Sequence, residues 1–339
     1  EAVVKALVTG GGGYLGGAIV RALLTRGDSV RSLARGDYPQ LAKLGVETVR
    51  GDLGDAATVS EAARGCEVVF HTAARTGIAG TRAQFERVNV EGTRNVIEAC
   101  RAQRIERLVY TSTPSVVSAG GEVEGVDESA PYPERFEAEY PRTKAIAERL
   151  VLAANGAELR TVALRPHLIW GPGDTQLVAR IVARAKAGRL RLVGSGKALI
   201  DVVFVDNAAE AHLLAADRLG PDSPVAGKAY FITQGEPVAV ATMINAILAA
   251  AGLPPETRTI PPRAAWLAGW MLELVHRAFR PDQEPQMTRF VAKQLSTPHW
   301  FDISAARRDL GYSPRVSTEE GLRRLAESLR GAGADTQGA

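Results

Sequence analysis

The stretch Thr9-Gly10-Gly11-Gly12-Gly13-Tyr14-Leu15-Gly16 decides the fold of this chain. It follows Val3–Thr9, an apolar segment rich in β-branched residues, and it opens a helical pattern that runs to Arg26. An apolar β-rich run followed by glycines and then by a helical period predicts a strand, a tight loop and a helix.

In such a unit the spacing of three glycines is typical of a phosphate-binding loop. Gly10 permits the tight turn, Gly13 lets the backbone approach a pyrophosphate, and Gly16 lets the helix pack closely on the strand. The first helical turn, with Tyr14 and Leu15, offers free N–H groups and a positive dipole end to the anion. We therefore predict dinucleotide binding, with a purely structural glycine turn as the alternative.

The rest of the first half alternates short apolar runs with helical patterns. We expect helices at Ala56–Ala63 and Gln84–Arg104, and strands at Ser29–Ala34, Val46–Arg50, Val68–His71, Ile105–Ser112 and Leu159–Arg165. Regular βαβ alternation with connections of this length predicts an α/β fold with a doubly wound parallel sheet, the Rossmann fold.

The pattern becomes looser after about residue 170. We expect residues 1–170 to form mainly the dinucleotide-binding domain and 171–330 a smaller substrate-binding part, with 196–225 returning to the first domain. Expected elements of this half are strands at Val202–Val205 and Ala229–Ile232 and helices at Asn207–Leu219, Val240–Ala251 and Glu319–Leu329. Ser317 and Glu320 have the spacing of a capping box for the last helix, and 331–339 is expected to be a flexible tail.

Composition excludes several classes of protein. Among 339 residues, 41 are basic and 38 acidic, a net charge of +3 that is too small for a nucleic-acid footprint. Cys66 and Cys100 are too few for a disulfide scaffold and lack zinc-site spacing, so we expect no metal and a reduced, cytoplasmic location. We expect no membrane span, because no apolar run is long enough, and no signal peptide in the printed residues.

The end of the second strand indicates which dinucleotide is bound. NAD-binding loops place an acidic residue there for the ribose 2′-hydroxyl, but this chain has Ala34 followed by Arg35. A guanidinium can pair with a 2′-phosphate, so we predict NADP(H), with an ordinary exposed arginine as the alternative. Asp52 and Leu53, after the third strand, are expected near the adenine; Asp52 could also be a helix N-cap.

Tyr140-Pro141-Arg142-Thr143-Lys144 places a phenol and an ammonium four residues apart, on one face of a helix. A ketone reductase must protonate the substrate oxygen, and tyrosine is neutral at pH 7. We expect Lys144 and a cationic nicotinamide to lower the phenol pKa. Thr113, or Ser112 beside it, follows a buried strand where doubly wound sheets bind ligands, and its hydroxyl would hold the substrate oxygen. A surface helix turn and a plain loop are the alternatives.

These motifs, taken together, resemble one family. The glycine loop is followed by His71-Thr72-Ala73-Ala74, Asn89-Val90-Glu91-Gly92-Thr93, Tyr110-Thr111-Ser112-Thr113, Tyr140-x-x-x-Lys144, Leu164-Arg165-Pro166 and His299-Trp300-Phe301. In this order they resemble the extended short-chain dehydrogenase/reductases, and within them the 3β-hydroxysteroid dehydrogenase/isomerase branch, over nearly the whole chain. Residues 110–116, 164–174 and 294–300 are similar to bacterial reductases of 2-alkyl-3-oxoalkanoates from long-chain olefin biosynthesis.

The resemblance implies that Tyr140 is the general acid, that Lys144 binds the nicotinamide ribose and tunes the phenol, and that Thr113 is the third hydroxyl of the site. It further implies cofactor contacts at Ala73, Ser112 and Pro166, and it places Asn89 near the site. His167 stands where the olefin enzymes have a basic residue, so it would bind the substrate carboxylate in a pH-dependent way; a buried histidine bonded to backbone is the alternative. A homodimer through helices at Gln84–Arg104 and Tyr140–Ala154 is also implied.

One late segment, 264–277, is strongly apolar but is interrupted by charges, which predicts an amphipathic helix. Trp266, Trp270 and Leu274 would share one face of it. Three interpretations stay open: core packing, a pocket for long alkyl chains that includes Trp266 and Trp270, or a face for a partner or a membrane surface.

The resemblance implies NADPH-dependent reduction of the 3-keto group of a long-chain 2-alkyl-3-oxoalkanoate, with hydride from NADPH and a proton from Tyr140. Its partners would be a long-chain β-keto acid substrate and other enzymes of olefin biosynthesis. A 3β-hydroxysteroid or sterol dehydrogenase and a non-catalytic NADP-sensing regulator are the alternatives.

Overall fold

A seven-stranded sheet forms the centre of the computed structural model, which describes residues 3–77, 79–118, 122–279, 285 and 287–335. All of its neighbouring strands run parallel. The strand order is β12-β7-β5-β4-β1-β2-β3, with bounds β1 Lys5–Thr9, β2 Ser29–Ala34, β3 Glu47–Arg50, β4 Val68–His71, β5 Arg107–Thr111, β7 Arg160–Pro166 and β12 Lys228–Ile232. The chain reverses direction across the sheet between β1 and β4, which is where ligands of such sheets bind.

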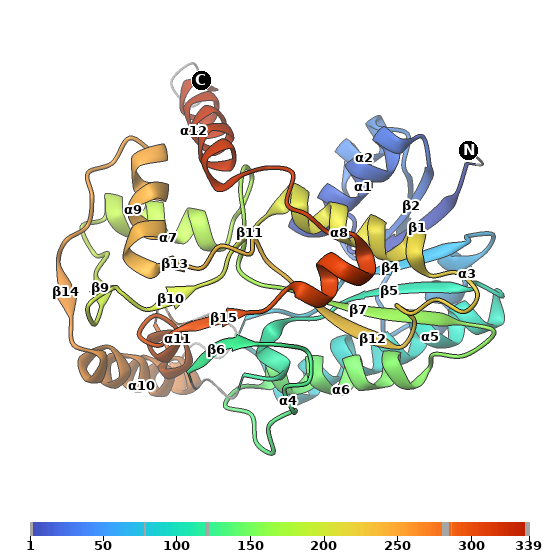
Figure 1. Cartoon of the computed structure of the whole chain (residues 1–339), viewed down its shortest axis with the longest axis horizontal. Coiled ribbons are helices and arrows are strands. Elements are labelled where there is room, and N and C mark those ends of the chain that lie inside the picture. Colours follow the sequence, from blue (N-terminus) through green and yellow to red (C-terminus); the bar gives the residue numbers. More distant parts are fainter. Residues whose placement is uncertain (1–2, 78, 119–121, 280–284, 286, 336–339) are drawn as a thin grey trace.

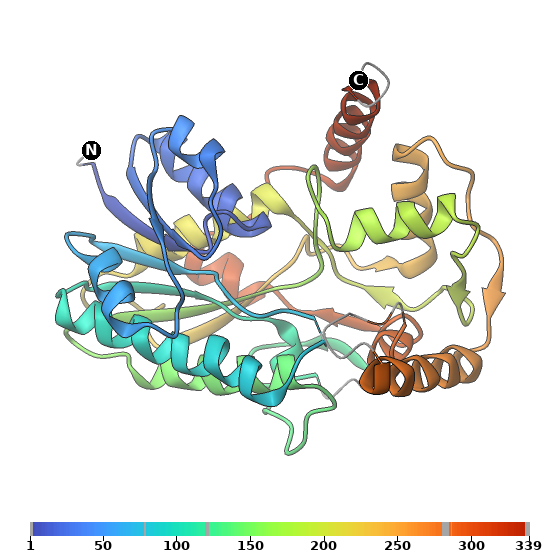
Figure 2. The ribbon, with the colours of Figure 1, turned by 180° about the vertical axis from the view of Figure 1, so that it is seen from behind.

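Helices cover both faces of this sheet, as Figures 1 and 2 show. On one face α1 (Tyr14–Arg26) packs against α8 (Val205–Arg218). On the other, α5 (Gly92–Ala102) packs against both α3 (Ala56–Ala63) and α6 (Glu139–Ala153). The predicted doubly wound parallel sheet is therefore confirmed.

A smaller layer lies beside the carboxyl ends of the strands, built from the second half of the chain together with β6 of the first half (Figure 1). Its four-stranded sheet has the order β13-β10-β15-β6, and the pairs β11–β8 and β14–β9 lie outside it. The strands are β6 Val123–Val126, β8 Ile169–Trp170, β9 Leu192–Val193, β10 Leu199–Ile200, β11 Val203–Phe204, β13 Val238–Ala239, β14 Thr259–Ile260 and β15 His299–Phe301. The helices are α7 Leu177–Lys186, α9 Val240–Ala250, α10 Pro262–Phe279, α11 Arg289–Gln294 and α12 Thr318–Asp335.

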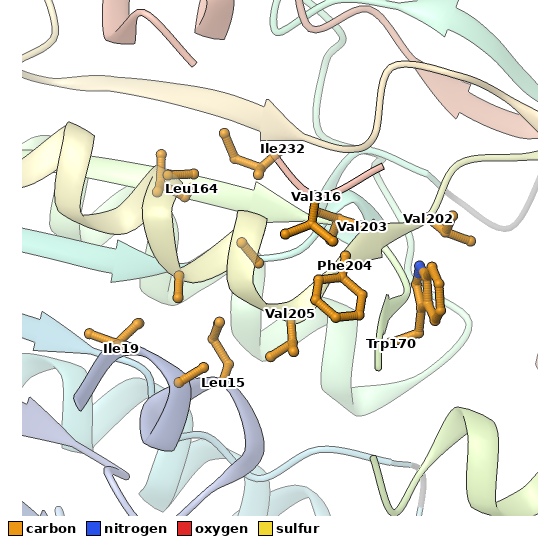
Figure 3. Close-up of a cluster of buried hydrophobic side chains, with 14 of the residues drawn as sticks. Leu15, Ile19, Leu164, Trp170, Val202, Val203, Phe204, Val205, Ile232 and Val316 are labelled. Carbon is orange, nitrogen blue, oxygen red and sulfur yellow. The ribbon is translucent and has the colours of Figure 1, made fainter. Parts of the chain in front are cut away.

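A continuous cluster of buried apolar side chains joins the two parts (Figure 3). Leu15 and Ile19 of α1 and Leu164 of β7 belong to the same cluster as Trp170 of β8 and Phe204 of β11. The indole of Trp170 lies edge-on against the ring of Phe204, with centroids 5.3 Å apart. Since α8 and β12 also return to the large sheet, the second half is packed onto the first rather than linked to it by a tether.

Several helical regions differ in detail from the sequence expectation. The helix expected at Gln84–Arg104 consists of α4 (Arg82–Phe85), a π-helical segment at Glu86–Glu91, and α5. Short elements that the sequence did not indicate are α2 (Pro39–Lys43), a 3₁₀ turn at Pro114–Val116 and a π-helical turn at Ala306–Leu310. The last helix extends to Asp335, beyond the expected end at Leu329, while residues 336–339 lie outside the described residues.

Candidate active site

The glycine loop connects β1 to α1 at the carboxyl edge of the sheet. Gly10 has a φ of +76°, a conformation that favours glycine, and its N–H donates to the carbonyl of Leu33 at 2.7 Å. The N–H of Gly13 donates back to the Gly10 carbonyl at 2.8 Å and closes the turn. A Cβ on Gly16 would lie 2.1 Å from the Gly10 oxygen, so this position requires glycine for helix and loop to pack.

The start of α1 has the features of an anion-binding site. Gly13 is the N-cap of α1, so no side chain covers the first-turn amides of Tyr14 and Leu15. A Cβ on Gly13 would meet the Gly10 carbonyl oxygen at 3.1 Å and no other atom within 4 Å. The geometry shows the turn at Gly10 and the close packing at Gly16, while the approach of Gly13 to a pyrophosphate stays a prediction.

Arg35 follows β2 at the rim of this loop. Its side chain is exposed, and within the described parts of the chain no hydrogen bond from its guanidinium occurs. The guanidinium of Arg50 donates to the Arg35 carbonyl at 3.2 Å, which brings two cations to the ends of β2 and β3. The ring of Tyr38 lies against the loop, since a Cβ on Gly12 would lie 2.4 Å from it. Sequence reasoning had not singled out Arg50 or Tyr38.

Three further predicted cofactor contacts follow strands at the same carboxyl edge of the sheet, Ala73 after β4 and Asp52 and Leu53 after β3. Ala73 packs against Gly10, where a Cβ would come within 3.1 Å of the alanine methyl group. Leu53 is buried. Asp52 accepts from the N–H of Gly54 at 2.8 Å. The alternative that Asp52 caps the following helix is wrong, because Asp55 caps α3 by accepting from the N–H groups of Ala57 and Thr58.

The predicted catalytic hydroxyls lie together at the end of β5. Thr113 is buried, and its hydroxyl interacts with the half-buried phenol of Tyr140, the second residue of α6. Burial raises the pKa of Tyr140 to about 12, although the hydrogen bond with Thr113 lowers it. This direction is opposite to the depression expected from the sequence, because desolvation outweighs the other influences on the phenolate. Ser112 is also buried, and within the described structure its hydroxyl finds no hydrogen-bond partner.

Lys144 extends from α6 across the end of β5. Its Nζ donates to the Thr111 carbonyl at 2.6 Å and lies 4.1 Å from the centre of the Tyr110 ring. Only 3% of Lys144 is exposed, and burial lowers its pKa to about 7, while the Glu148 carboxylate acts in the opposite direction. A lysine with this pKa changes its charge near neutrality.

Helix α6 is fixed to the sheet by a buried ion pair one turn after Lys144. The Glu148 carboxylate accepts from the Arg165 guanidinium of β7 at 2.6 and 3.0 Å, and from the Tyr132 hydroxyl at 2.6 Å. The two charged side chains are 0% and 3% exposed. This pair sets the position of α6, and with it the positions of Tyr140 and Lys144.

Asn89 connects α6 to the loop after β4. Its amide donates to the Thr143 hydroxyl at 2.9 Å and to the Arg75 carbonyl at 3.0 Å, and it accepts from the Arg75 N–H at 2.7 Å. Because Thr143 precedes Lys144, Asn89 acts on the site by positioning the helix. The placement of Asn89 near the site agrees with the sequence expectation, and its side chain is fully engaged in these bonds.

His167 follows β7 and is buried beside His299 and Phe301, with ring centroids 5.0 and 5.3 Å away. Burial lowers its pKa well below 6.5, so its imidazole is neutral at pH 7. The backbone N–H of His167 bonds to Ile232, whereas its Nδ1 has no partner in the described structure. This environment disfavours the charged imidazole that pH-dependent binding of a substrate carboxylate by His167 would require. Pro166, the preceding residue, ends β7.

Trp266 and Trp270 lie on α10 and are 46% and 40% exposed. Core packing, one of the three interpretations of this segment, is therefore wrong for this face of the helix. Over the described residues, no cluster of three or more His, Cys, Asp or Glu side chains suited to a metal ion is present. Cys66 and Cys100 are buried free thiols. None of the helices in the described ranges is long and apolar enough to cross a bilayer.

Comparison with known proteins identifies the family of this chain. A profile of the 3-beta hydroxysteroid dehydrogenase/isomerase family matches residues 7–262. The 2-alkyl-3-oxoalkanoate reductase of Stenotrophomonas maltophilia is 52% identical over 327 residues, which cover 96% of this chain and 99% of that protein. The protein of the same name from Shewanella oneidensis is 50% identical over 335 residues, covering 96% and 87%. The solved UDP-glucose 4-epimerase of Thermus thermophilus in complex with NAD has a TM-score of 0.71 at 27% identity, covering 97% of this chain and all of that one.

The chain therefore belongs to the 3-beta hydroxysteroid dehydrogenase/isomerase family of short-chain dehydrogenase/reductases. It is an oxidoreductase that acts on CH–OH or C=O groups with a nicotinamide dinucleotide. The similarity to 2-alkyl-3-oxoalkanoate reductases supports a ketoreductase role.

Proposed function

We propose that this enzyme uses NADPH to reduce the 3-keto group of a long-chain 2-alkyl-3-oxoalkanoate to the corresponding 3-hydroxy acid, a step of olefin hydrocarbon biosynthesis. The observation that carries the proposal is the convergence of Thr113, Tyr140 and Lys144 beside an open glycine loop. The substrate class is supported by relatives of that name at 50% and 52% identity over 96% of the chain.

Tyr140 is the proton donor of the proposed reaction. When bound, the cofactor supplies a hydride to the carbonyl carbon, and negative charge develops on the carbonyl oxygen. Thr113 holds that oxygen by hydrogen bonding, and Tyr140 gives its phenolic proton to it. A phenol with a pKa near 12 is fully protonated at pH 7, and an alkoxide is the stronger base, so the transfer is downhill.

Lys144 has two proposed tasks: its ammonium would hold the nicotinamide ribose, and its charge would stabilise the phenolate left after proton transfer. Its pKa of about 7 means that the free enzyme carries this charge only in part at neutral pH. Bond formation to the ribose hydroxyls would favour the charged form.

The choice of NADPH rests on Arg35. Its exposed guanidinium and the neighbouring Arg50 stand at the end of β2, where Ala34 replaces the acidic residue of NAD sites. Bidentate pairing of a guanidinium with a phosphate explains the preference that we propose.

We further propose a cytoplasmic homodimer that works beside other enzymes of olefin biosynthesis. Of the residues considered for the dimer face, Ile97, Ala99 and Val151 are buried within the chain. Ile146 and Leu150, one turn apart on α6, are half-buried and remain available for a second copy.

An NADPH-oxidation assay with a long-chain 2-alkyl-3-oxo acid, run beside a 3-ketosteroid, tests the proposal. We expect turnover of the keto acid and its loss in Tyr140→Phe. Turnover of the steroid alone would instead assign a 3β-hydroxysteroid or sterol dehydrogenase. Tight cofactor binding without turnover of either compound would support the non-catalytic sensor.

A further inference from the structure

Helix α10 presents an apolar face to solvent. Six large side chains form this α10 face and are between 40% and 49% exposed: Trp266, Leu267, Trp270, Met271, Leu274 and Val275. At about 100° per residue they cover roughly half of the helix circumference. A surface helix of a soluble protein normally directs polar residues outward, so this helix has the reverse arrangement.

The inward side of α10 shows that the reversal is built into the fold. Ala265 is fully buried, and a Cβ on Gly269 would lie 2.5 Å from the Thr288 carbonyl carbon, so small residues let α10 pack closely on the start of α11. Glu273 flanks this contact and accepts from the Arg289 guanidinium at 2.8 Å. Large apolar side chains could therefore not take the places of Ala265 and Gly269 without loss of this packing.

Among the charged residues of the segment 262–279, basic residues outnumber acidic ones. Glu273 is the only carboxylate of the segment 262–279, and it is paired with Arg289. Arg263 is exposed, in the same helix as the apolar residues. The guanidinium of Arg289 lies 5.8 Å from the ring centre of Trp266. Because Arg289 is neutralised by Glu273, Arg263 gives this border its positive charge, and an apolar, tryptophan-bearing face beside an exposed guanidinium has the chemistry of an interfacial helix on an anionic bilayer.

The α10 face lies close to the chain that enters the active site. Between α10 and α11 there is an apolar groove of about 480 Å³, lined by Pro262, Arg263, Trp266, Leu267, Ala292, Lys293 and Ser296. Lys293 pairs with Glu137 at 2.8 Å, three residues before Tyr140. Figures 1 and 2 show α10 at the end of the molecule opposite α3, with α11 between it and the centre.

We propose that the α10 face docks the enzyme onto the surface of an anionic lipid bilayer, with the helix lying in the interface and not crossing it. The biological role of this docking rests on the proposed function, since a substrate with two long alkyl chains dissolves in a bilayer rather than in water. Docked in this way, the enzyme takes its substrate from the lipid phase beside the α10–α11 groove.

Vesicle flotation of the full chain, without substrate or cofactor, tests docking directly. We use vesicles of phosphatidylcholine alone and of equal parts phosphatidylcholine and phosphatidylglycerol. We expect flotation with the anionic vesicles, weakened by salt. Leu267→Glu should reduce the partition coefficient at least tenfold, because it removes a large apolar contact and adds a repelled charge. Arg263→Glu should reduce it at least fivefold on anionic vesicles and much less on neutral ones.

The matched control is Leu44→Glu. Leu44 follows α2 and is 51% exposed, compared with 49% for Leu267, so the same chemical change is made at equal exposure on a different surface. We expect Leu44→Glu to float like the wild type. The circular dichroism spectra of all variants should be unchanged, since the substituted side chains contact water.

Three results would overturn the proposal. The wild type could fail to float with vesicles, or Leu267→Glu and Leu44→Glu could lose flotation equally. In the third, the wild type does not bind vesicles but is a dimer that Leu267→Glu converts to a monomer. The last result would assign the face to a second copy. Because flotation needs no substrate, docking with no ketoreductase activity would reject the proposed function and leave this inference standing.

Discussion

Lys144→Met should stabilise the folded enzyme, and increasingly so as the pH falls from 9 to 7. The folded-state pKa of Lys144 is about 7 and its ordinary value is 10.5, so the unfolded chain binds this proton more tightly. The free energy of unfolding of the wild type therefore decreases as the pH falls from 10.5 towards 7. Below pH 7 the lysine is protonated in both states, and its contribution no longer changes. The full difference corresponds to about 5 kcal/mol, of which about 2 kcal/mol falls between pH 9 and pH 7.

Urea unfolding of the cofactor-free protein at pH 7 and pH 9 measures this effect. We expect the free energy of unfolding of Lys144→Met, minus that of the wild type, to be about 2 kcal/mol larger at pH 7 than at pH 9. Loss of the bond to the Thr111 carbonyl adds a cost to the variant, but this cost is similar at both pH values.

Lys43→Met is the control, because Lys43 is exposed at the end of α2. Its difference from the wild type should not change with pH. If the Lys144→Met difference were also independent of pH, Lys144 would not be held in a desolvated site, and the reasoning about its charge in the free enzyme would be refuted.

Four further results are expected. Tyr140→Phe should lower kcat by more than tenfold and leave the Kd for NADPH, measured by fluorescence titration, nearly unchanged; retention of more than a tenth of kcat would reject the proton-donor role. Arg35→Ala should weaken NADPH binding by about 1.5–3 kcal/mol and NADH binding hardly at all, whereas equal changes for both would remove the case for NADPH. Glu148→Gln should lower the free energy of unfolding by about 3–5 kcal/mol, because the Arg165 guanidinium would stay buried without its counter-charge; a change below 1 kcal/mol would mean that water reaches this pair. Light scattering should give twice the mass of one chain, with Leu150→Glu monomeric; a monomeric wild type would contradict the dimer.

The amino-acid sequence by itself determined the large sheet and its ligand edge. Glycines at 10, 13 and 16 after a β-rich run define a strand–loop–helix unit, because the turn and the close packing tolerate no side chain there. The alternation of apolar runs and helical periods predicted that the strands run parallel, because each pair of strands is joined through a helix by short connections. Tyr140 and Lys144 could be paired in advance, since residues four apart on a helix always share a face.

Short-range patterns indicated the longer helices of the second half, β12 and β11, but not its other short strands. β8 to β10 and β13 to β15 have two or three residues each, too few for a periodic signal, and they exist because they pair with distant strands. The cap of α3 was likewise not found from the sequence, which suggested Asp52, and only the backbone path around the loop placed Asp55 at that position.

The tertiary structure alone decided the charges and exposures on which function depends. Lys144 has a lowered pKa because β5 and the Tyr110 ring enclose it, and the pKa of Tyr140 is raised by burial rather than lowered by its neighbour. The apolar period of α10 fixed one face of that helix, but a period is the same whether the face meets a core or water. Gly269 packs against the start of α11, and this contact turns the apolar face of α10 outward. The sequence alone could not show this, because desolvation and side-chain contact depend on the whole fold.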